Sequence, residues 1–179
     1  QDLERELQWL QEQAEVSVEL MRCDVSDEAS LSGVLSDARR AGPSDGAVHS
    51  AGGLRDALIR GGGAESGSAE VWSSKARSAR LLHEGTACDD LKLFLTYSSI
   101  AAAYGNIGQA AYGAANAYLD ALMEERASAG LCGLSVQWPA ISGVGMAAAT
   151  MAASGSGGGI LTEGTASPAD VDQLISDVL

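Results

Sequence analysis

Cysteine, basic residues and long apolar runs are scarce in this chain of 179 residues, and each scarcity excludes a class of protein. The three cysteines, Cys23, Cys88 and Cys132, are odd in number and far apart, so they form neither a CxxC pair nor a zinc-binding spacing. This pattern favours unpaired thiols in a reducing compartment. No cluster of His, Cys or carboxylate residues has metal-site spacing, and we therefore expect no metal.

Basic residues are far fewer than acidic residues. Lys and Arg number 11 against 24 Asp and Glu, which gives a formal net charge of −13. Because binding to nucleic acid needs Lys and Arg clusters that neutralise phosphates, no nucleic-acid partner is expected. No apolar run has membrane-spanning length, and no basic and then apolar leader opens the chain. We expect no membrane-spanning segment and a cytoplasmic location, with a plastid or other organelle stroma as the alternative.

Helical and strand-like segments alternate along the chain. The periodicity predicts helices at 2–13, 24–42, 68–86, 108–130 and 167–179, with Ser26 as the N-cap of the second. Apolar or alternating segments predict strands at 14–23, 45–53, 91–99 and 131–140. Alternation of this kind predicts an α/β fold with a parallel sheet and helices on both faces. Ligands in such folds bind beyond the carboxyl ends of the strands.

Local sequence at these strand ends resembles the ketoreductase domains of modular polyketide synthases and fatty acid synthases, in the short-chain dehydrogenase/reductase superfamily. The most specific match is TYSSIAAAYGNIGQAAYGAANAYLDAL at 96–122, against the family pattern F-S-S-x-A…G-Q-x-x-Y-x-x-x-N-x-x-L-D-A-L. Shorter matches are CDVSD at 23–27, HSAGG at 49–53, SSKARSARLLHE at 73–84 and VQWPAISGVGMA at 136–147. The resemblance implies a Rossmann-like doubly wound parallel sheet.

The resemblance places the family's catalytic positions on Lys75, Ser99, Tyr112 and Asn116. Tyr112 would protonate the substrate oxygen, and Ser99 would hydrogen-bond the carbonyl and stabilise the developing oxyanion. Lys75 would supply a positive charge that favours the ionised form of Tyr112, directly or through the cofactor ribose. Asn116 would hold Lys75 or a water. In most of the superfamily a lysine stands four residues after the tyrosine; a lysine from another helix is typical of synthase ketoreductases.

The resemblance also implies a cofactor, a substrate and a partner. The cofactor would be NADPH, and the substrate a β-ketoacyl thioester on an acyl carrier protein, reduced to the β-hydroxyacyl thioester. GLRD at 53–56 resembles the L-D-D motif of B-type reductases, which favours the D-hydroxyl product. A flexible lid is expected at about 147–166. The residues expected to bind the cofactor are Asp24, Val25, Ser50, Ala51, Gly52, Lys75, Tyr112, Pro139 and Ile141.

Several parts of the family pattern have no counterpart in the sequence. The glycine-rich phosphate loop T-G-G-x-G-x-x-G, the first two strands and the last strand are missing, and the glycines at 155–159 follow no strand and open no helix. We therefore expect residues 1–179 to form a partial catalytic domain with an incomplete sheet. Gln1 in place of an initiator Met favours a processed chain or a piece of a longer one. The rest of a larger synthase chain, or a partner polypeptide, would complete the sheet.

Two classes of function remain open, with a variant of the first. The first is a reductase seen as part of a larger chain, which the four matching catalytic positions favour. The second is a catalytically inactive ketoreductase-like element that serves as a structural or interaction subunit of an assembly, which the missing phosphate loop favours. The variant, a short-chain reductase acting on free small molecules, is disfavoured by the position of the lysine. Direct pairing of residues 16–20 with 46–50 in a closed sheet would favour the structural element.

Overall fold

Three parallel strands make up the sheet in the computed structural model, which describes residues 2–12, 17–59, 64–141 and 165–178. The strands β1 (Gly46–His49), β2 (Leu93–Ser99) and β3 (Leu134–Trp138) lie in that order, with His49 opposite Thr96 and Ser99 opposite Trp138. Because all three run in the same direction, their carboxyl ends meet at one edge of the sheet. The predicted strands at 45–53, 91–99 and 131–140 are confirmed in shorter form.

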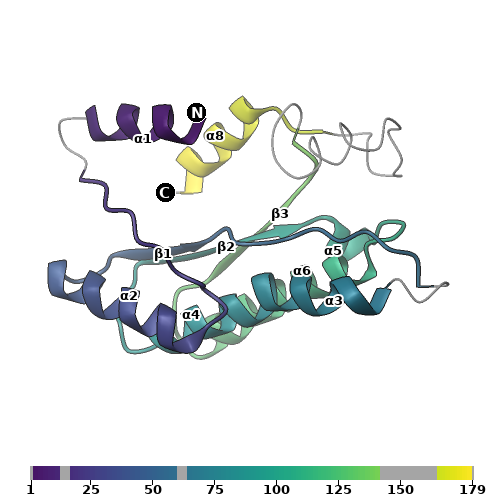
Figure 1. Ribbon diagram of the computed structural model, residues 1–179, viewed down its shortest axis with the longest axis horizontal. Helices are drawn as coiled ribbons and strands as arrows, with labels where there is room; N and C mark the ends of the chain where they lie inside the picture. The colour runs from purple at the N-terminus through teal and green to yellow at the C-terminus, as the bar shows by residue number, and fades with distance from the viewer. Residues whose placement is uncertain (1, 13–16, 60–63, 142–164, 179) are drawn as a thin grey trace.

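Most of the helices lie together on one face of the sheet, as Figure 1 shows. They are α2 (Glu28–Ala41), α3 (Ala64–Trp72), η1 (Ser73–Arg77), α4 (Ser78–Thr86) and α6 (Ala110–Ser128), with the short α5 (Ala101–Tyr104) between β2 and α6. The elements α3, η1 and α4 follow one another without interruption, so the predicted helix at 68–86 begins earlier and contains a π turn. No helix within the described ranges is long and apolar enough to cross a membrane.

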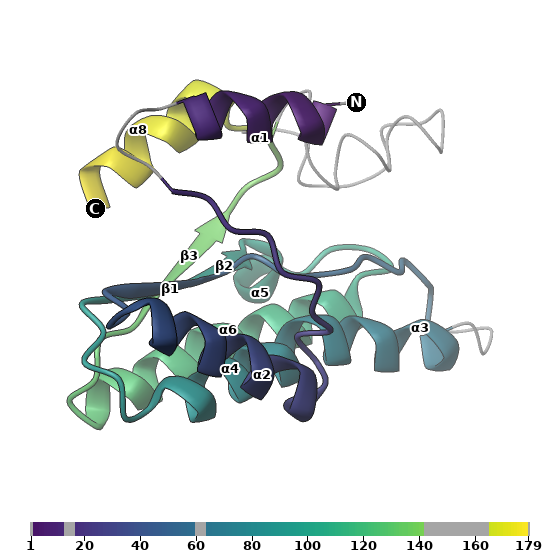
Figure 2. The same cartoon turned by 60° about the vertical axis from the view of Figure 1, so that its left-hand side comes forward.

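Two further helices lie on the opposite side of the sheet. These are α1 (Asp2–Glu12) and α8 (Pro168–Val178), and both views of the molecule place them across the sheet from α2, α4 and α6 (Figure 2). The arrangement confirms the α/β class with helices on both sides of a parallel sheet. The predicted lid at 147–166 falls outside the described residues, apart from its last two positions.

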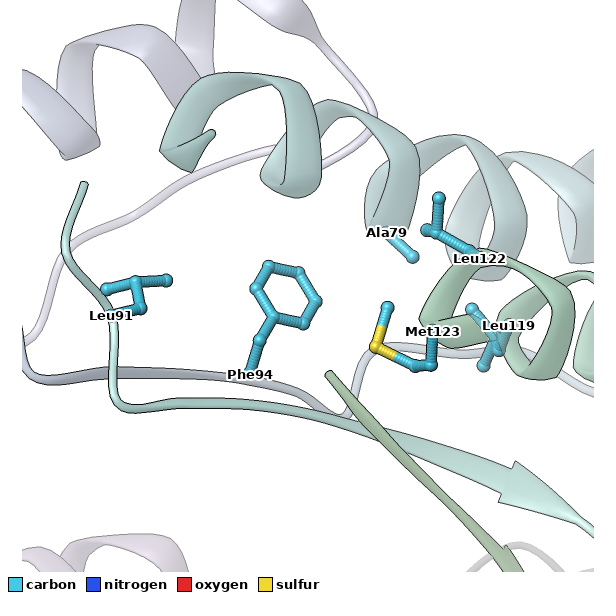
Figure 3. Close-up of a cluster of buried hydrophobic side chains, with 6 residues drawn as sticks. All are labelled: Ala79, Leu91, Phe94, Leu119, Leu122 and Met123. Carbon is cyan, nitrogen blue, oxygen red and sulfur yellow. The ribbon is translucent and has the colours of Figure 1, made fainter. Parts of the chain in front are cut away.

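The core lies between β2 and the helices α4 and α6. Phe94 of β2 is fully buried and packs against Ala79, Leu119, Leu122 and Met123, as Figure 3 shows. β2 is the middle strand, so both of its edges are paired and most of its residues are buried. Burial of this apolar surface fixes α6 across β2, and α6 is the helix that carries the tyrosine and asparagine of the predicted site.

A buried arginine closes the end of this core. Arg126 of α6 is 1% exposed, donates from Nε to the carbonyl of Cys132 at 2.7 Å, and lies 4.0 Å from the centre of the Phe94 ring. Its Nη1 lies 2.7 Å from His83 Nδ1, which must accept the hydrogen bond because a guanidinium only donates. Burial and the Arg126 charge lower the pKa of His83. The contacts tie α6 to α4 and to the start of β3.

The strand predicted at 14–23 is wrong for the part of it that the structure describes. Residues 17–24 have no regular secondary structure, and Leu20 is 68% exposed. A strand is stabilised only where a neighbour completes its hydrogen-bonded ladder, and within the described residues β1 pairs only with β2. Residues 17–20 therefore do not pair with β1, and the closed sheet that would have favoured a structural element does not form in the described chain.

The turn before α2 corrects a smaller prediction. Asp27, rather than Ser26, is the N-cap, and its carboxylate accepts from the backbone N–H of Ser30 at 2.8 Å. Ser26 instead donates from its backbone nitrogen and its hydroxyl to Asp24 Oδ1, at 2.9 and 2.7 Å. The Ser26 side chain therefore bonds to Asp24, two residues earlier, and does not cap α2. These bonds to Ser26 lower the pKa of Asp24.

Candidate active site

Lys75 lies in the π turn η1 and is almost completely buried. It is 3% exposed, although a lysine in a helix is ordinarily solvated. Its Nζ donates to the carbonyl of Tyr97 in β2 at 2.8 Å and lies 5.5 Å from the centre of the Tyr112 ring. The side chain therefore reaches from the helix layer to the carboxyl end of the middle strand, where a ligand would bind.

Tyr112 and Asn116 occupy successive turns of α6 and face this lysine's end of the sheet. Asn116 is fully buried, and its Nδ2 donates to the carbonyl of Tyr112 at 2.8 Å. Its Oδ1 is buried and has no hydrogen-bond partner among the described residues. Ser98 of β2 donates to the carbonyl of Asn116 at 3.2 Å and so fastens this turn of α6 to the strand. The free amide oxygen leaves Asn116 able to accept a hydrogen bond from a water or an ammonium group.

Ser99 ends β2 at the same edge of the sheet. Its hydroxyl oxygen accepts from the backbone N–H of Ala101, the first residue of α5, at 3.2 Å. The Ser99 and Asn116 side chains hydrogen-bond the Tyr112 phenol, and these bonds act to lower its pKa. The four predicted catalytic side chains therefore converge at the carboxyl ends of the strands, from a π turn, a strand end and one helix.

Burial is the main influence on the electrostatics of the site. Burial raises the pKa of Tyr112 above its ordinary value, and Lys75 is not among the groups that lower it. That Lys75 favours the ionised form of Tyr112, directly or through the cofactor ribose, stays a prediction. Burial also lowers the pKa of Lys75 to about 8, against the opposing attraction of Asp120. Both shifts have the same physical cause, because burial disfavours the charged form of each group.

The turn after β1 packs directly against Lys75. A Cβ added to Gly52 would lie 2.9 Å from Cε of Lys75, closer than real Cβ contacts allow, and 3.2 Å from its Cγ, which is tight. Gly52 is therefore needed for the close approach of a neighbouring side chain. Ser50 and Gly52 are exposed at this edge, and Ala51 is half-buried.

We expect Gly52→Ala to displace the Lys75 ammonium and to lower turnover about ten- to a hundredfold, because small displacements of positioning groups have effects of this size. Gly53→Ala is the matched control, since a Cβ there would meet only Ser74 Oγ at an ordinary 3.5 Å. Steady-state kinetics of the two variants decide the matter. Equal activity in both would show that the Gly52 contact does not hold Lys75.

The remaining residues predicted to bind the cofactor occupy two separate places. Asp24 and Val25 lie in the turn before α2, where Arg77 of η1 donates to the carbonyl of Ser26 at 2.9 Å and links that turn to the Lys75 turn. Pro139 and Ile141 are half-buried after β3, and Ile141 forms a parallel bridge with Ala166. Within the described ranges, no three His, Cys, Asp or Glu side chains gather closely enough to hold a metal ion.

An apolar hollow of about 490 Å³ adjoins the start of α6. Its walls include Ala57 and Ile59 of the loop after β1, Trp72 of α3, and Ala111 and Ala114 of α6. The Ala57 amide donates to the carbonyl of Gly108 at 2.9 Å, and Gln109 Nε2 donates to Asp56 Oδ2 at 3.2 Å. These bonds hold the GLRD segment against the helix that carries Tyr112.

Two further groups lie behind the four predicted catalytic side chains, and sequence reasoning missed the second of them, Asp120. His49 Nε2 lies 2.6 Å from the hydroxyl of Ser78, and both residues are buried next to the π turn. Asp120 lies one turn beyond Asn116, accepts from Ser135 at 2.5 Å and from Gln137 at 2.8 Å, and attracts Lys75. The i, i+4, i+8 spacing of Tyr112, Asn116 and Asp120 could have identified the aspartate. The π turn has no equally clear sequence signal.

His49 makes a testable contribution to acid sensitivity. Burial lowers its pKa from 6.5 to about 4, so between these values the unfolded chain binds a proton that the folded chain does not. Stability should therefore fall as the pH decreases from about 6.5 to 4, by about 3 kcal/mol in all. Denaturant unfolding across this range should show the loss in the wild type and not in His49→Gln. Parallel stability curves would contradict the assignment.

The comparisons with known proteins agree with this geometry. A family model described as the KR domain matches residues 1–143. Among curated relatives, the Mycobacterium bovis "Phenolphthiocerol synthesis polyketide synthase type I Pks15/1" is 40% identical over 121 residues, 67% of this chain. The Mycobacterium tuberculosis "Putative inactive phenolphthiocerol synthesis polyketide synthase type I Pks1" is 39% identical over 127 residues, 70% of this chain. The chain spans only 6% and 8% of the lengths of these two synthases.

Solved structures show the same fold. "The first ketoreductase of the tylosin PKS" aligns over 87% of this chain and 33% of its own, with a TM-score of 0.72 and 37% identity. The ketoreductase from the first module of phoslactomycin biosynthesis in Streptomyces sp. HK803 aligns over 73% of this chain and 30% of its own, with a TM-score of 0.67 and 39% identity. The chain therefore belongs to the KR domain family, the ketoreductase domains of polyketide synthases, within the short-chain dehydrogenase/reductase superfamily.

Proposed function

We propose that this chain forms the proton-donating part of a ketoreductase domain that reduces a β-ketoacyl thioester, carried on an acyl carrier protein, to the β-hydroxyacyl thioester. The observation that carries the proposal is the buried Lys75. Its ammonium lies between the Tyr97 carbonyl and the Tyr112 ring at the carboxyl edge of the sheet. A cation is costly to bury in a site that needs only packing. A site that reduces a carbonyl needs such a charge near its proton donor.

The chain's own side chains supply the steps at the carbonyl oxygen. Tyr112 donates its phenol proton to that oxygen, and its raised pKa keeps the phenol protonated at neutral pH. Ser99 donates a hydrogen bond to the same oxygen and stabilises the negative charge that develops there. Lys75, still mostly protonated at pH 7, favours the phenolate left behind, and the free Asn116 Oδ1 holds the water that returns a proton. The resulting product is a β-hydroxyl group.

The described residues fit one side of a nicotinamide cofactor. NADPH, when bound, supplies the hydride that adds to the carbonyl carbon. Ser50, Ala51 and Gly52 offer a small-residue turn beside Lys75, and Asp24 and Val25 lie at the same edge of the layer. In the described ranges no strand runs through a glycine-rich turn directly into a helix, the element that binds a pyrophosphate. Residues outside these ranges, in the same or another chain, would hold the phosphates.

The hollow beside α6 suits the acyl part of the substrate. Its alanine, isoleucine and tryptophan walls are apolar, and it lies next to the turn of α6 that carries Tyr112. The Asp56–Gln109 bond fixes its rim, and by its resemblance to the B-type motif this rim favours the D-hydroxyl product. The carrier protein, the acyl chain and the cytoplasmic location stay predictions.

The test is an assay on the complete protein that contains this chain. A β-ketoacyl thioester on an acyl carrier protein is incubated with NADPH or NADH, and both nucleotide oxidation and the β-hydroxyacyl product are measured. We expect product formation that depends on the thioester and prefers NADPH. A folded protein that forms no product with either nucleotide would favour the alternative, a catalytically inactive structural element.

A further inference from the structure

The turn that carries Lys75 is closed by a side chain as well as by the backbone. In an α-helix the N–H of Ser78 would donate to the carbonyl of Ser74, four residues back. Here it donates to the carbonyls of Ser73 and Lys75. The Ser78 hydroxyl instead donates to the Ser74 carbonyl at 2.6 Å. The Lys75 carbonyl also lies within hydrogen-bond distance of this hydroxyl, at 3.1 Å. The hydroxyl of Ser78 therefore donates to the carbonyl that its own backbone N–H would reach in an α-helix. Turns of the π type recur at functional sites.

His49, at the end of β1, forms a hydrogen bond with this Ser78 hydroxyl. Because both backbone carbonyls only accept, the Ser78 hydroxyl proton points toward them, and its oxygen accepts from His49 Nε2–H at 2.6 Å. This assigns the His49 proton to Nε2 and leaves Nδ1 unprotonated, without a partner among the described residues. His49 is 4% exposed and Ser78 is fully buried, so water does not compete for the bond.

The end of β1 and the turn after it hold the Lys75 region in two ways. His49, the last residue of β1, fixes the backbone of the π turn through Ser78. Gly52, in the turn that follows, packs against the stem of the Lys75 side chain. β1 thus sets both where the Lys75 backbone lies and the direction in which its side chain leaves the helix. A regular α-helical turn would move every following residue by about 100° around the axis.

We propose that His49 and Ser78 are positioning residues for Lys75: their hydrogen bond holds the π turn that directs the Lys75 ammonium to the Tyr97 carbonyl and the Tyr112 ring. The kinetic consequence rests on the proposed reductase function. The structural consequence, that Lys75 is held in one buried position, does not depend on that function.

Four variants of the complete protein isolate this role. Ser78→Ala removes the hydroxyl. His49→Asn shortens the side chain and loses the donor at Nε2, whereas His49→Gln keeps an N–H at about that place. Thr86→Val is the matched control, because Thr86 is a buried hydroxyl near the other end of α4 that donates to the Leu82 carbonyl at 2.7 Å.

Amine acylation followed by peptide mass spectrometry reads the position of Lys75 without turnover. Lys92, whose side chain is 80% exposed, is the other lysine of the chain and serves as the internal reference. Relative to Lys92, Lys75 should be acylated at least about tenfold faster in Ser78→Ala and His49→Asn, because a misdirected lysine leaves its buried place. In the same two variants kcat should fall about tenfold, with KM little changed. His49→Gln and Thr86→Val should keep the wild-type values.

Unchanged acylation of Lys75 in Ser78→Ala, or equal effects in Thr86→Val, overturns the proposal. Faster acylation with undiminished kcat overturns its kinetic part. If the wild-type protein reduces no thioester, the proposed function fails, while the acylation rates still decide the positioning role. Should His49→Asn not fold, Ser78→Ala, which removes a single buried atom, decides alone.

Discussion

Replacing Tyr112 with phenylalanine is expected to lower kcat for a β-ketoacyl thioester by about a hundredfold or more, the usual size of a general-acid contribution. The variant removes one oxygen from a mostly buried ring whose position is set by α6 and by the Lys75 ammonium above it. Binding of NADPH and of the thioester should change little, because both are held mainly by other groups. Steady-state kinetics on the complete protein give kcat and KM separately.

Tyr118→Phe provides the matched control. Tyr118 lies on the same helix, where its ring packs against Trp72 with 5.4 Å between ring centres. Its hydroxyl has no part in the proposed reaction, so near-normal turnover is expected. Near-normal turnover in Tyr112→Phe as well would remove Tyr112 from the mechanism.

Replacing Lys75 with methionine should abolish most turnover and at the same time stabilise the fold. Burial lowers the Lys75 pKa from 10.5 to about 8, so at neutral pH the folded chain holds a charge in an unfavourable place. A shift of this size corresponds to about 3 kcal/mol, and the lost hydrogen bond to the Tyr97 carbonyl offsets part of it. We expect a net gain of about 1–3 kcal/mol at pH 7, a trade-off known from functional sites.

The pH dependence makes this prediction specific. Between about pH 8 and 10.5 the unfolded wild-type chain binds more protons at Lys75 than the folded chain does, so wild-type stability rises with pH there. The stability advantage of Lys75→Met should therefore shrink over that interval. Lys92→Met is the control, since Lys92 is an exposed lysine paired with Asp45 and should matter little for stability or turnover. A Lys75→Met domain that unfolds more easily than the wild type at pH 7 would contradict the account.

The sequence alone predicted the three strands that form and the edge of the sheet where the candidate side chains meet. β1, β2 and β3 each carry a pattern that is satisfied by neighbours in the described chain, and periodicity found α2 and α6 within a few residues. The strand predicted at 14–23 does not form at residues 17–23, because it lacks such a neighbour. Its alternating valines and leucine resemble a strand, but a strand also needs a partner, and no partner lies beside residues 17–23 in the described chain.

The family resemblance gave the four candidate catalytic positions, but neither the pKa shifts there nor the residues that hold them in place. The burial that raises the Tyr112 pKa and lowers the Lys75 pKa depends on packing between η1, β2 and α6. The π turn around Lys75 is also a tertiary result. Ser78 in SSKARS fits an ordinary helix, and only the contact with His49, 29 residues earlier, shows why the turn widens there.

A single-turnover experiment can follow the transferred hydride and show whether its transfer depends on Tyr112. The complete protein is mixed with a carrier-bound β-ketoacyl thioester and NADPH deuterated at the transferred position, and the product is analysed by mass spectrometry. The account predicts one deuterium at the β-carbon for the wild type, and formation of the same product at least about a hundredfold more slowly for Tyr112→Phe. A wild-type protein that binds the nucleotide and transfers no deuterium, or a Tyr112→Phe variant as fast as the wild type, would contradict it.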